Sequence, residues 1–175
     1  VGASGYSGEE LVHRLLNHPC AALTAITSRQ FADQALSKIF PRFTGQGVAD
    51  TLKFTEPDPS ILAQTAEIVF LALPHGAAAE YTQELLENDI RVIDLSADFR
   101  LRNPAVYEEF YGDKHPAPNL LKEAVYGLPE LYRKEIHAAK LVASPGCYPT
   151  SILLPTVPLL KAGLIKPTGI IANSL

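Results

Sequence analysis

Near its N-terminus the chain carries the segment Gly2-Ala3-Ser4-Gly5-Tyr6-Ser7-Gly8, which runs directly into a helical pattern from Gly8 to Asn17. Three glycines permit a tight turn, close approach of a phosphate to the backbone, and close packing of a helix on a strand. The helix N-terminus then offers free N–H groups and a positive dipole end to a pyrophosphate. The spacing is G-x-x-G-x-x-G rather than the commoner G-x-G-x-x-G, so a plain turn is the alternative. We favour a dinucleotide site, whose expected cofactor-binding residues are Gly2, Ser4, Gly5, Tyr6, Ser7 and Gly8.

Downstream of this segment, short apolar runs alternate with helical patterns. The runs are rich in Val, Ile and Leu on consecutive positions, which is typical of strands covered on both faces. The expected strands are Leu23–Thr27, Ile68–Leu73, Val92–Leu95, Leu141–Ala143 and Gly169–Ala172. The expected helices are Gly8–Asn17, Ala77–Leu86 and a helix that Asn103-Pro104 starts and that ends near Tyr111. This alternation predicts an α/β protein with a doubly wound, mostly parallel sheet of the Rossmann type.

The pattern also suggests a domain boundary near residues 144–147. We assign residues 1–146 to an NADP-binding Rossmann-type domain and residues 147–175 to the beginning of an α+β catalytic and dimerisation domain. The first strand is expected to be truncated, because a glycine motif of this kind normally follows a complete strand. The segment Tyr111–Pro129 carries several prolines and is interpreted as an excursion from the sheet with one short helix.

The residues after the second strand indicate which dinucleotide is bound. Folds that bind NAD place an Asp or Glu about 20 residues past the glycines, where it holds the ribose hydroxyls. Here that place holds Thr27-Ser28-Arg29. A hydroxyl and a guanidinium suit a 2′-phosphate, which a carboxylate would repel. Ser28 and Arg29 therefore predict NADP, the alternative being a surface arginine after a strand.

Composition excludes several classes of partner. The net charge is −4 and no run of Lys or Arg stands out, so we expect neither nucleic acid nor an anionic membrane as a partner. The longest apolar stretch, Ser151–Leu160, contains two prolines and is far shorter than the roughly 20 residues that span a bilayer. Only two cysteines occur, which favours reduced thiols and a cytoplasmic location. We see no signal peptide and expect no bound metal.

The two cysteines lie in unlike settings. Cys147 follows a strand and the sharp turn Ser144-Pro145-Gly146, which places it at or near a helix N-terminus. There the dipole and free N–H groups favour the nucleophilic thiolate. Cys20 follows His18-Pro19 in a turn and fits a small apolar side chain. We therefore predict Cys147 as the nucleophile.

Four motifs together resemble one known family. They are Gly2 to Leu11, Asp94-Leu95-Ser96-Ala97-Asp98-Phe99-Arg100, Tyr126-Gly127-Leu128-Pro129-Glu130 and Pro145-Gly146-Cys147-Tyr148-Pro149-Thr150. In this order, and over the full length of the chain, they resemble the N-acetyl-gamma-glutamyl-phosphate reductases. The resemblance implies NADPH-dependent reduction of N-acetyl-L-glutamyl 5-phosphate to the 5-semialdehyde plus phosphate, a step of arginine biosynthesis. Aspartate-semialdehyde dehydrogenase and a lysine-pathway reductase with a carrier-protein substrate are alternatives with other residues around the cysteine.

The resemblance also implies a mechanism and further site residues. Cys147 attacks the acyl phosphate, phosphate departs, and hydride reduces the resulting thioester. The family's acid/base histidine lies in a second half that this sequence does not contain. His75 resembles a cofactor-side position, with a helix-start residue as the equal alternative. Arg100 is expected to anchor the substrate, although a salt bridge to Asp94 or Asp98 is also open.

Two expectations concern the whole protein. We expect a homo-oligomer, either a dimer or a tetramer, that acts on a small-molecule acyl phosphate. The competing hypothesis from another class is a non-catalytic sensor that binds NADP. The Pro145-Gly146-Cys147 turn speaks against a sensor, because a sensor needs no activated thiol.

Overall fold

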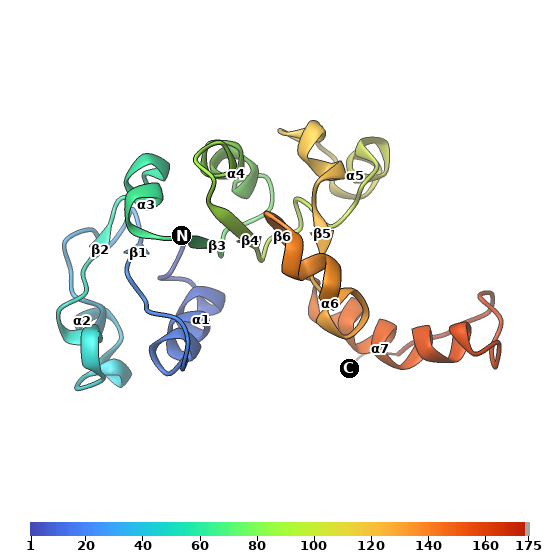
Figure 1. The fold of residues 1–175 in the computed structure, drawn as a ribbon, viewed down its shortest axis with the longest axis horizontal. Helices are drawn as coiled ribbons and strands as arrows, with labels where there is room; N and C mark the ends of the chain where they lie inside the picture. Colours follow the sequence, from blue (N-terminus) through green and yellow to red (C-terminus); the bar gives the residue numbers. More distant parts are fainter. Residues whose placement is uncertain (174–175) are drawn as a thin grey trace.

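Parallel strands form the centre of the molecule in the computed structural model, which describes residues 1–173 (Figure 1). In this part of the chain the strands are β1 (Ile26–Thr27), β2 (Phe54–Thr55), β3 (Ile68–Leu71), β4 (Arg91–Asp94), β5 (Val125–Tyr126) and β6 (Leu141–Ala143). One sheet pairs β1 with β2, and the other has the order β3-β4-β6-β5. All of these pairs are parallel.

The first residues of the chain join the two sheets. Ala3 N donates to Thr27 O at 3.1 Å on one side, and Ala72 N donates to Val1 O at 2.9 Å on the other. Val1 N also donates to Phe70 O at 2.7 Å. Residues 1–3 therefore occupy the strand position between β1 and β3. The order β2, β1, residues 1–3, β3, β4, β6 is that of a doubly wound dinucleotide-binding sheet, which confirms the predicted fold class.

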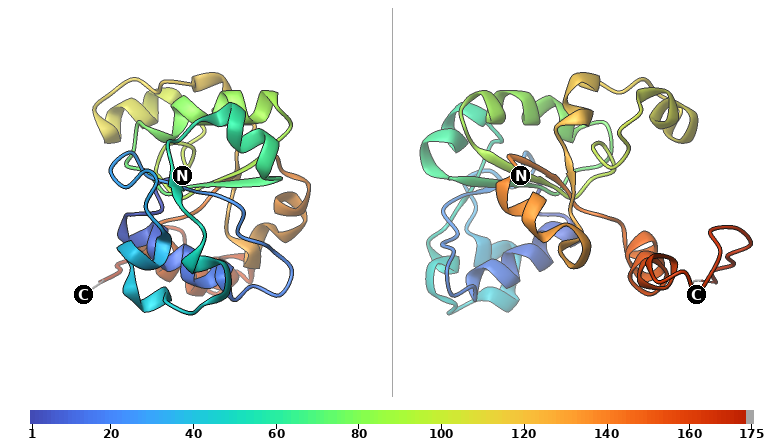
Figure 2. Two further views of the ribbon diagram at one scale, coloured as in Figure 1. Left: turned by 90° about the vertical axis from the view of Figure 1, so that its left-hand side faces the viewer. Right: turned by 45° about the vertical axis from the view of Figure 1, so that its right-hand side comes forward.

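Helices cover both faces of this sheet. Figure 1 shows α3 and α4 on one face and α1 and α6 on the other, and Figure 2 shows the same layers from the side. The α-helices are α1 (Tyr6–Leu16), α2 (Leu36–Ile39), α3 (Pro59–Thr65), α4 (Ala78–Glu87), α5 (Pro104–Tyr111), α6 (Pro129–Ala138) and α7 (Cys147–Lys161). Short 3-10 helices are η1 (Pro41–Phe43), η2 (Gly47–Asp50) and η3 (Pro118–Lys122).

Two clusters of buried apolar side chains hold the layers together. The larger lies around β3, β4 and β6 and includes Leu71, Leu85, Val92 and Leu141. The smaller lies between α1, β1 and β2 and includes Phe43 and Phe54. Fully burying a side chain of this size contributes about 1.5–3 kcal/mol to the stability of the fold. These clusters therefore fix the positions of the strands and of the loops that follow them.

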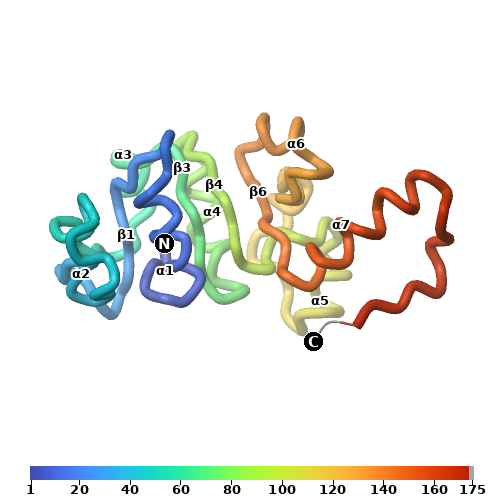
Figure 3. The backbone as a smooth tube through the Cα atoms, turned by 90° about the horizontal axis from the view of Figure 1, so that it is seen from below, coloured from blue at the N-terminus to red at the C-terminus, as the bar shows by residue number. Residues whose placement is uncertain are grey.

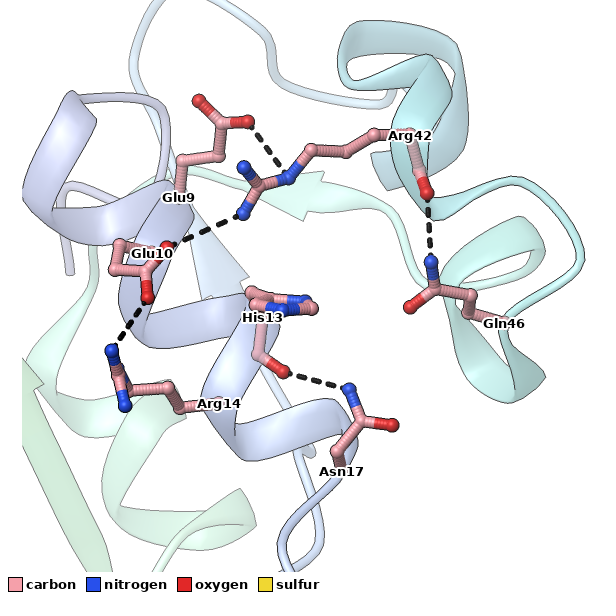
Figure 4. A network of polar contacts seen from close by, with 7 residues as sticks. All are labelled: Glu9, Glu10, His13, Arg14, Asn17, Arg42 and Gln46. Atoms are coloured by element: carbon pink, nitrogen blue, oxygen red, sulfur yellow. Dashed lines mark hydrogen bonds and ion pairs between the residues drawn. The ribbon is translucent and has the colours of Figure 1, made fainter.

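Polar contacts tie the outer face of α1 to the segment that follows α2 (Figure 4). Arg42 reaches Glu9 at 3.1 Å and Glu10 at 3.7 Å, and Glu10 also pairs with Arg14. Gln46 Nε2 donates to the carbonyl of Arg42 at 2.7 Å. Each exposed ion pair contributes at most about 1 kcal/mol, so the network mainly fixes the orientation of the helix that carries the glycine segment.

Several elements differ from the sequence prediction. The expected strand Leu23–Thr27 is limited to its last two residues, because only Ile26 and Thr27 pair with β2. The segment Tyr111–Pro129 contains η3, and it returns to the sheet as β5, which the prediction missed. The helices α2, α3 and α6 were also missed.

The predicted strand Gly169–Ala172 is wrong. Gly169 has φ +74°, a left-handed conformation that breaks an extended run. Ile171 is 88 % exposed, and Figure 3 shows this end of the chain running apart from the sheet. Among residues 1–173 no neighbouring strand pairs with this segment, and the apolar pattern alone does not form a strand. Residues 174–175 of the segment 147–175 lie outside the described residues.

Candidate active site

The predicted site residues gather at one edge of the sheet. Parallel strands end at the same edge, where α/β proteins of this type bind their ligands. The segments there are residues 2–8, 28–29 after β1, 72–77 after β3, 95–100 after β4 and 144–147 after β6. The fold therefore brings together loops that are up to 145 residues apart in the sequence.

Two of the three glycines are required by close contacts. Gly2 has φ +78°, and a Cβ at this position would lie 2.3 Å from Ala72 O. A Cβ on Gly8 would lie 2.3 Å from Gly2 O. Gly5 differs, because its Cβ would meet nothing closer than Gly2 O at 3.7 Å. Gly8 thus permits the close packing of α1 on the start of the chain, and Gly2 permits the close approach of that segment to the end of β3. The surface beside Gly5 stays open.

The N-terminus of α1 faces this open surface. Gly5 is the N-cap, and no side chain caps the helix. The N–H groups of Tyr6, Ser7 and Gly8 have no acceptor within a helix. The side chains of Tyr6 and Ser7 are exposed. Free amides and the helix dipole together form a favourable place for a phosphate.

The end of β1 contacts the glycine segment directly. Ser4 Oγ and Ser28 Oγ lie 2.9 Å apart, and Ser28 is buried. Arg29 is exposed, and its Nη2 donates to the hydroxyl of Tyr81 at 2.8 Å. The end of β1 thus holds one serine against the glycine segment and the adjacent arginine against α4.

The loop after β3 holds His75 in an exposed position. His75 lies in the turn that leads into α4, three residues before the first residue of that helix. Its ring centroid is 6.0 Å from that of Tyr111. The carboxylate of Asp98 holds this loop, because it accepts from Gly76 N at 2.6 Å and from Ala79 N at 3.2 Å.

Asp98 is fully buried and links three segments. Besides the loop before α4, it contacts the Tyr107 hydroxyl at 3.4 Å, and its backbone carbonyl lies 2.8 Å from His115 Nε2. Burial and the Asp98 carboxylate raise the pKa of Tyr107 to about 12. Burial lowers the pKa of His115. Tyr107 therefore keeps its proton and serves as a donor to Asp98.

Arg100 connects the loop after β4 to the turn before Cys147. Its Nε donates to Ser144 O at 2.8 Å, and its Nη2 donates to Leu95 O at 2.9 Å. Ser144 N donates in turn to Asp94 O at 2.7 Å, so both backbone groups of Ser144 are held. Within residues 1–173, Arg100 forms no ion pair with Asp94 or Asp98.

Cys147 is the first residue of α7. Gly146 is the N-cap and has extended backbone angles. A Cβ on Gly146 would lie 3.3 Å from Arg100 Nη1, so the third guanidinium nitrogen lies beside the residue that precedes the thiol. Both cysteines are exposed, but Cys20 lies in a turn between α1 and β1, away from a helix N-terminus.

A family model described as semialdehyde dehydrogenase, NAD binding domain, matches residues 1–139. The chain belongs to this family. The N-acetyl-gamma-glutamyl-phosphate reductase of Akkermansia muciniphila is 57 % identical over 99 % of the chain, and that of Nitrosococcus oceani is 49 % identical over 99 %. The chain spans about half the length of these curated relatives, 50 % in both cases. The resemblance identified from the four motifs is thus confirmed.

Solved structures of semialdehyde dehydrogenases share the fold of this family member. The aspartate semialdehyde dehydrogenase of Candida albicans with NADP gives a TM-score of 0.65 at 14 % identity and covers 92 % of this chain and 45 % of that chain. The aspartate semialdehyde dehydrogenase II of Vibrio cholerae gives 0.62 at 18 % identity, with the same coverage. At these identities the likeness shows the fold alone.

The structure adds residues to the candidate site that sequence reasoning missed. Tyr81 lies on the buried face of α4 and reads as a core residue in the sequence. Ser144 has no distinctive side-chain pattern, since its backbone makes the contacts. From the sequence alone, Asp98 was considered only as a salt-bridge partner of Arg100. The signal that could have found it is the presence of two carboxylates, Asp94 and Asp98, in one short motif after a strand.

Asp94 gives the domain a pH-dependent stability. Its buried carboxylate accepts from Ser96 N at 2.9 Å and from Ser96 Oγ at 2.8 Å. Burial nevertheless raises its pKa from 3.8 to about 6. The unfolded chain therefore releases this proton at a lower pH than the folded chain. As pH rises from about 4 to about 6, the free energy of unfolding falls by about 3 kcal/mol from this group.

We expect Asp94→Asn to remove this contribution. The free energy of unfolding of the unsubstituted protein should fall by about 3 kcal/mol from pH 4 to pH 7 because of Asp94, and that of the variant should not. The difference between variant and unsubstituted protein should therefore grow by about 3 kcal/mol over this range. Urea unfolding at a series of pH values measures this difference. Asp113→Asn, which removes an exposed carboxylate, is the control and should show little change. A parallel pH dependence for Asp94→Asn and the unsubstituted protein would contradict the assignment.

Within residues 1–173, no helix combines the length and apolar character needed to cross a membrane.

Proposed function

We propose that the protein reduces N-acetyl-L-glutamyl 5-phosphate to N-acetyl-L-glutamate 5-semialdehyde and phosphate with NADPH, a step of arginine biosynthesis. The observation that carries this proposal is the position of Cys147, which begins a helix at the sheet edge that also holds the glycine segment. The names of the curated relatives support the substrate.

The glycine segment fits the pyrophosphate of NADP. Close approach of an anion is possible at Gly5, and the first-turn amides of α1 are free to donate. Ser28 and Arg29 fit the 2′-phosphate, and His75, which is exposed in the loop after β3, fits a cofactor-side position. When bound, NADPH supplies the hydride for the reduction.

The thiol of Cys147 carries the covalent chemistry. Its thiolate attacks the acyl carbon, the C–O bond to phosphate breaks, and phosphate leaves with the electron pair of that bond. The resulting thioester accepts a hydride at the same carbon, and its carbonyl oxygen becomes the oxyanion of a thiohemiacetal. This oxyanion re-forms the C=O bond as the C–S bond breaks, which releases the aldehyde and returns Cys147 as the thiolate. The N–H groups in the first turn of α7 lie beside Cys147 and can donate to negative charge that develops there.

Arg100 is proposed to bind the anionic part of the substrate. Two of its nitrogens are engaged by backbone carbonyls, which hold the guanidinium beside Gly146. Its Nη1 lies next to the turn that carries Cys147 and can donate to a phosphate or carboxylate there. The carbonyls that hold the guanidinium are uncharged, so the positive charge of Arg100 favours an anion over a neutral group.

We infer further that the protein works in the cytoplasm as a homo-oligomer, either a dimer or a tetramer. Two exposed cysteines with no disulfide in the described residues fit a reducing compartment.

The reaction is tested with the complete protein in the reverse direction. We expect NADP to be reduced when both N-acetylglutamate 5-semialdehyde and inorganic phosphate are present, and not when phosphate is omitted. An NADP-binding sensor would bind the dinucleotide without turnover. Turnover with aspartate semialdehyde but not with N-acetylglutamate 5-semialdehyde would indicate that the protein is an aspartate-semialdehyde dehydrogenase instead.

Arg29→Asp is expected to weaken NADPH binding by a factor of about ten or more, because a charged hydrogen bond is replaced by repulsion. Affinity for NADH should fall much less. Titration of both dinucleotides by fluorescence measures the two dissociation constants. The control is Arg133→Asp, which reverses an exposed charge on α6. Unchanged affinities for both dinucleotides in Arg29→Asp would overturn the cofactor assignment.

A further inference from the structure

The contact between Arg29 and Tyr81 joins the loop after β1 to helix α4. Arg29 follows β1, which lies on one side of residues 1–3 in the sheet. Tyr81 belongs to α4, which follows β3 on the other side. Their 2.8 Å hydrogen bond therefore crosses the end of the strand position from which the glycine segment emerges. This is where the strand order reverses and where such sheets bind nucleotides.

Tyr81 is a rigid support for the flexible arginine. Its side chain is only 8 % exposed and belongs to the larger apolar cluster, beside Ala78 and Leu85 of the same helix. Arg29, by contrast, is exposed and forms no ion pair within the described residues. An arginine that is already held loses less conformational freedom when it binds an anion.

The hydrogen bond also leaves donors for a ligand. A guanidinium has five N–H donors, and Tyr81 accepts only one of them in this contact. The Tyr81 hydroxyl is uncharged, so it holds the guanidinium without neutralising the positive charge of Arg29. The nearby hydroxyls of Ser4 and Ser28 add two further polar groups to the same region. This set of donors suits a dianionic phosphate monoester rather than a neutral hydroxyl.

We propose that Tyr81 is a specificity-determining positioning residue, which holds Arg29 for the 2′-phosphate of NADPH. This inference rests on the proposed function of Arg29. Tyr81 acts through the arginine, so its hydroxyl sets the preference between NADPH and NADH without contributing to hydride transfer.

The test compares Tyr81→Phe with Arg29→Ala and the double variant in the complete protein. Dissociation constants for NADPH and NADH are measured by titration, and thermal unfolding is followed in parallel. We expect Tyr81→Phe to weaken NADPH binding about three- to tenfold and to leave NADH binding unchanged. In the Arg29→Ala background, Tyr81→Phe should have no further effect on NADPH. Tyr132→Phe, a hydroxyl deletion on α6, is the matched control.

The outcomes separate this inference from the function on which it rests. If Arg29→Ala leaves NADPH affinity intact, the cofactor assignment of Arg29 fails and the inference fails with it. If Arg29→Ala weakens NADPH but Tyr81→Phe does not, only the role of Tyr81 is wrong. Equal losses for NADPH and NADH in Tyr81→Phe would indicate a structural contribution and would also overturn the inference.

Discussion

Replacing Cys147 by alanine is expected to reduce turnover by at least about a thousandfold while leaving NADPH affinity nearly unchanged. The thiol forms the covalent bond to the acyl group, and its loss removes the reaction path. The thiol lies at the start of α7, whereas the proposed pyrophosphate site lies at the start of α1. Steady-state kinetics and NADPH titration on the same protein sample measure the two effects separately.

Cys20 provides the internal control for this assignment. Both thiols are exposed, so accessibility alone predicts similar labelling by an alkylating reagent. We expect Cys147 to be labelled faster, because only Cys147 begins a helix, and Cys20→Ala to retain activity. Cys147→Ser should also be severely impaired, since a hydroxyl stays protonated at neutral pH. An active Cys147→Ala variant, or exclusive labelling of Cys20, would show that another group is the nucleophile.

Gly8→Ala is expected to destabilise the domain by about 2–4 kcal/mol, a large part of the stability of an ordinary domain. The added Cβ would lie 2.3 Å from Gly2 O and 2.7 Å from Ala3 Cα. Both are backbone atoms, so the clash cannot be relieved by a side-chain rotation. Helix α1 would have to shift from the sheet, together with the amides at its N-terminus. Chemical denaturation measures the loss of stability.

Gly5→Ala is the matched variant in the same segment. Its Cβ would make only an ordinary contact at 3.7 Å, and the backbone angles at Gly5 are accessible to alanine. Loss of stability should stay below about 1 kcal/mol, while binding of the dinucleotide weakens because the methyl group occupies the open surface. Similar stabilities for Gly8→Ala and Gly5→Ala would contradict the packing argument.

The sequence predicts well those elements that local chemistry determines. Asn103-Pro104 begins α5 as expected, with Asn103 Oδ1 accepting from Ala105 N at 2.9 Å. The glycine segment leads into α1, and the turn before Cys147 leads into α7. Each of these starts depends on residues that are adjacent in the chain, so a single sequence contains the necessary information.

Elements that depend on distant partners are predicted less well. The two-residue strands β2 and β5 are too short to produce a periodic signal, and their pairing with β1 and β6 defines them. The run Gly169–Ala172 has the apolar pattern of a strand but no neighbour among the described residues. For the candidate site, the sequence identified Arg29 and Arg100, whereas their partners Tyr81 and Ser144 depend on contacts across 52 and 44 residues.

The double anchoring of Ser144 has a mechanical consequence for α7. With its N–H and C=O both engaged, Ser144 moves with the sheet. The ring of Pro145 fixes one of its two torsions, so most rotation between the sheet and the projecting helix must occur at Gly146. Cys147 follows this pivot immediately. Rotation at this pivot would therefore displace the far end of α7 much farther than Cys147, which is the first residue of the helix.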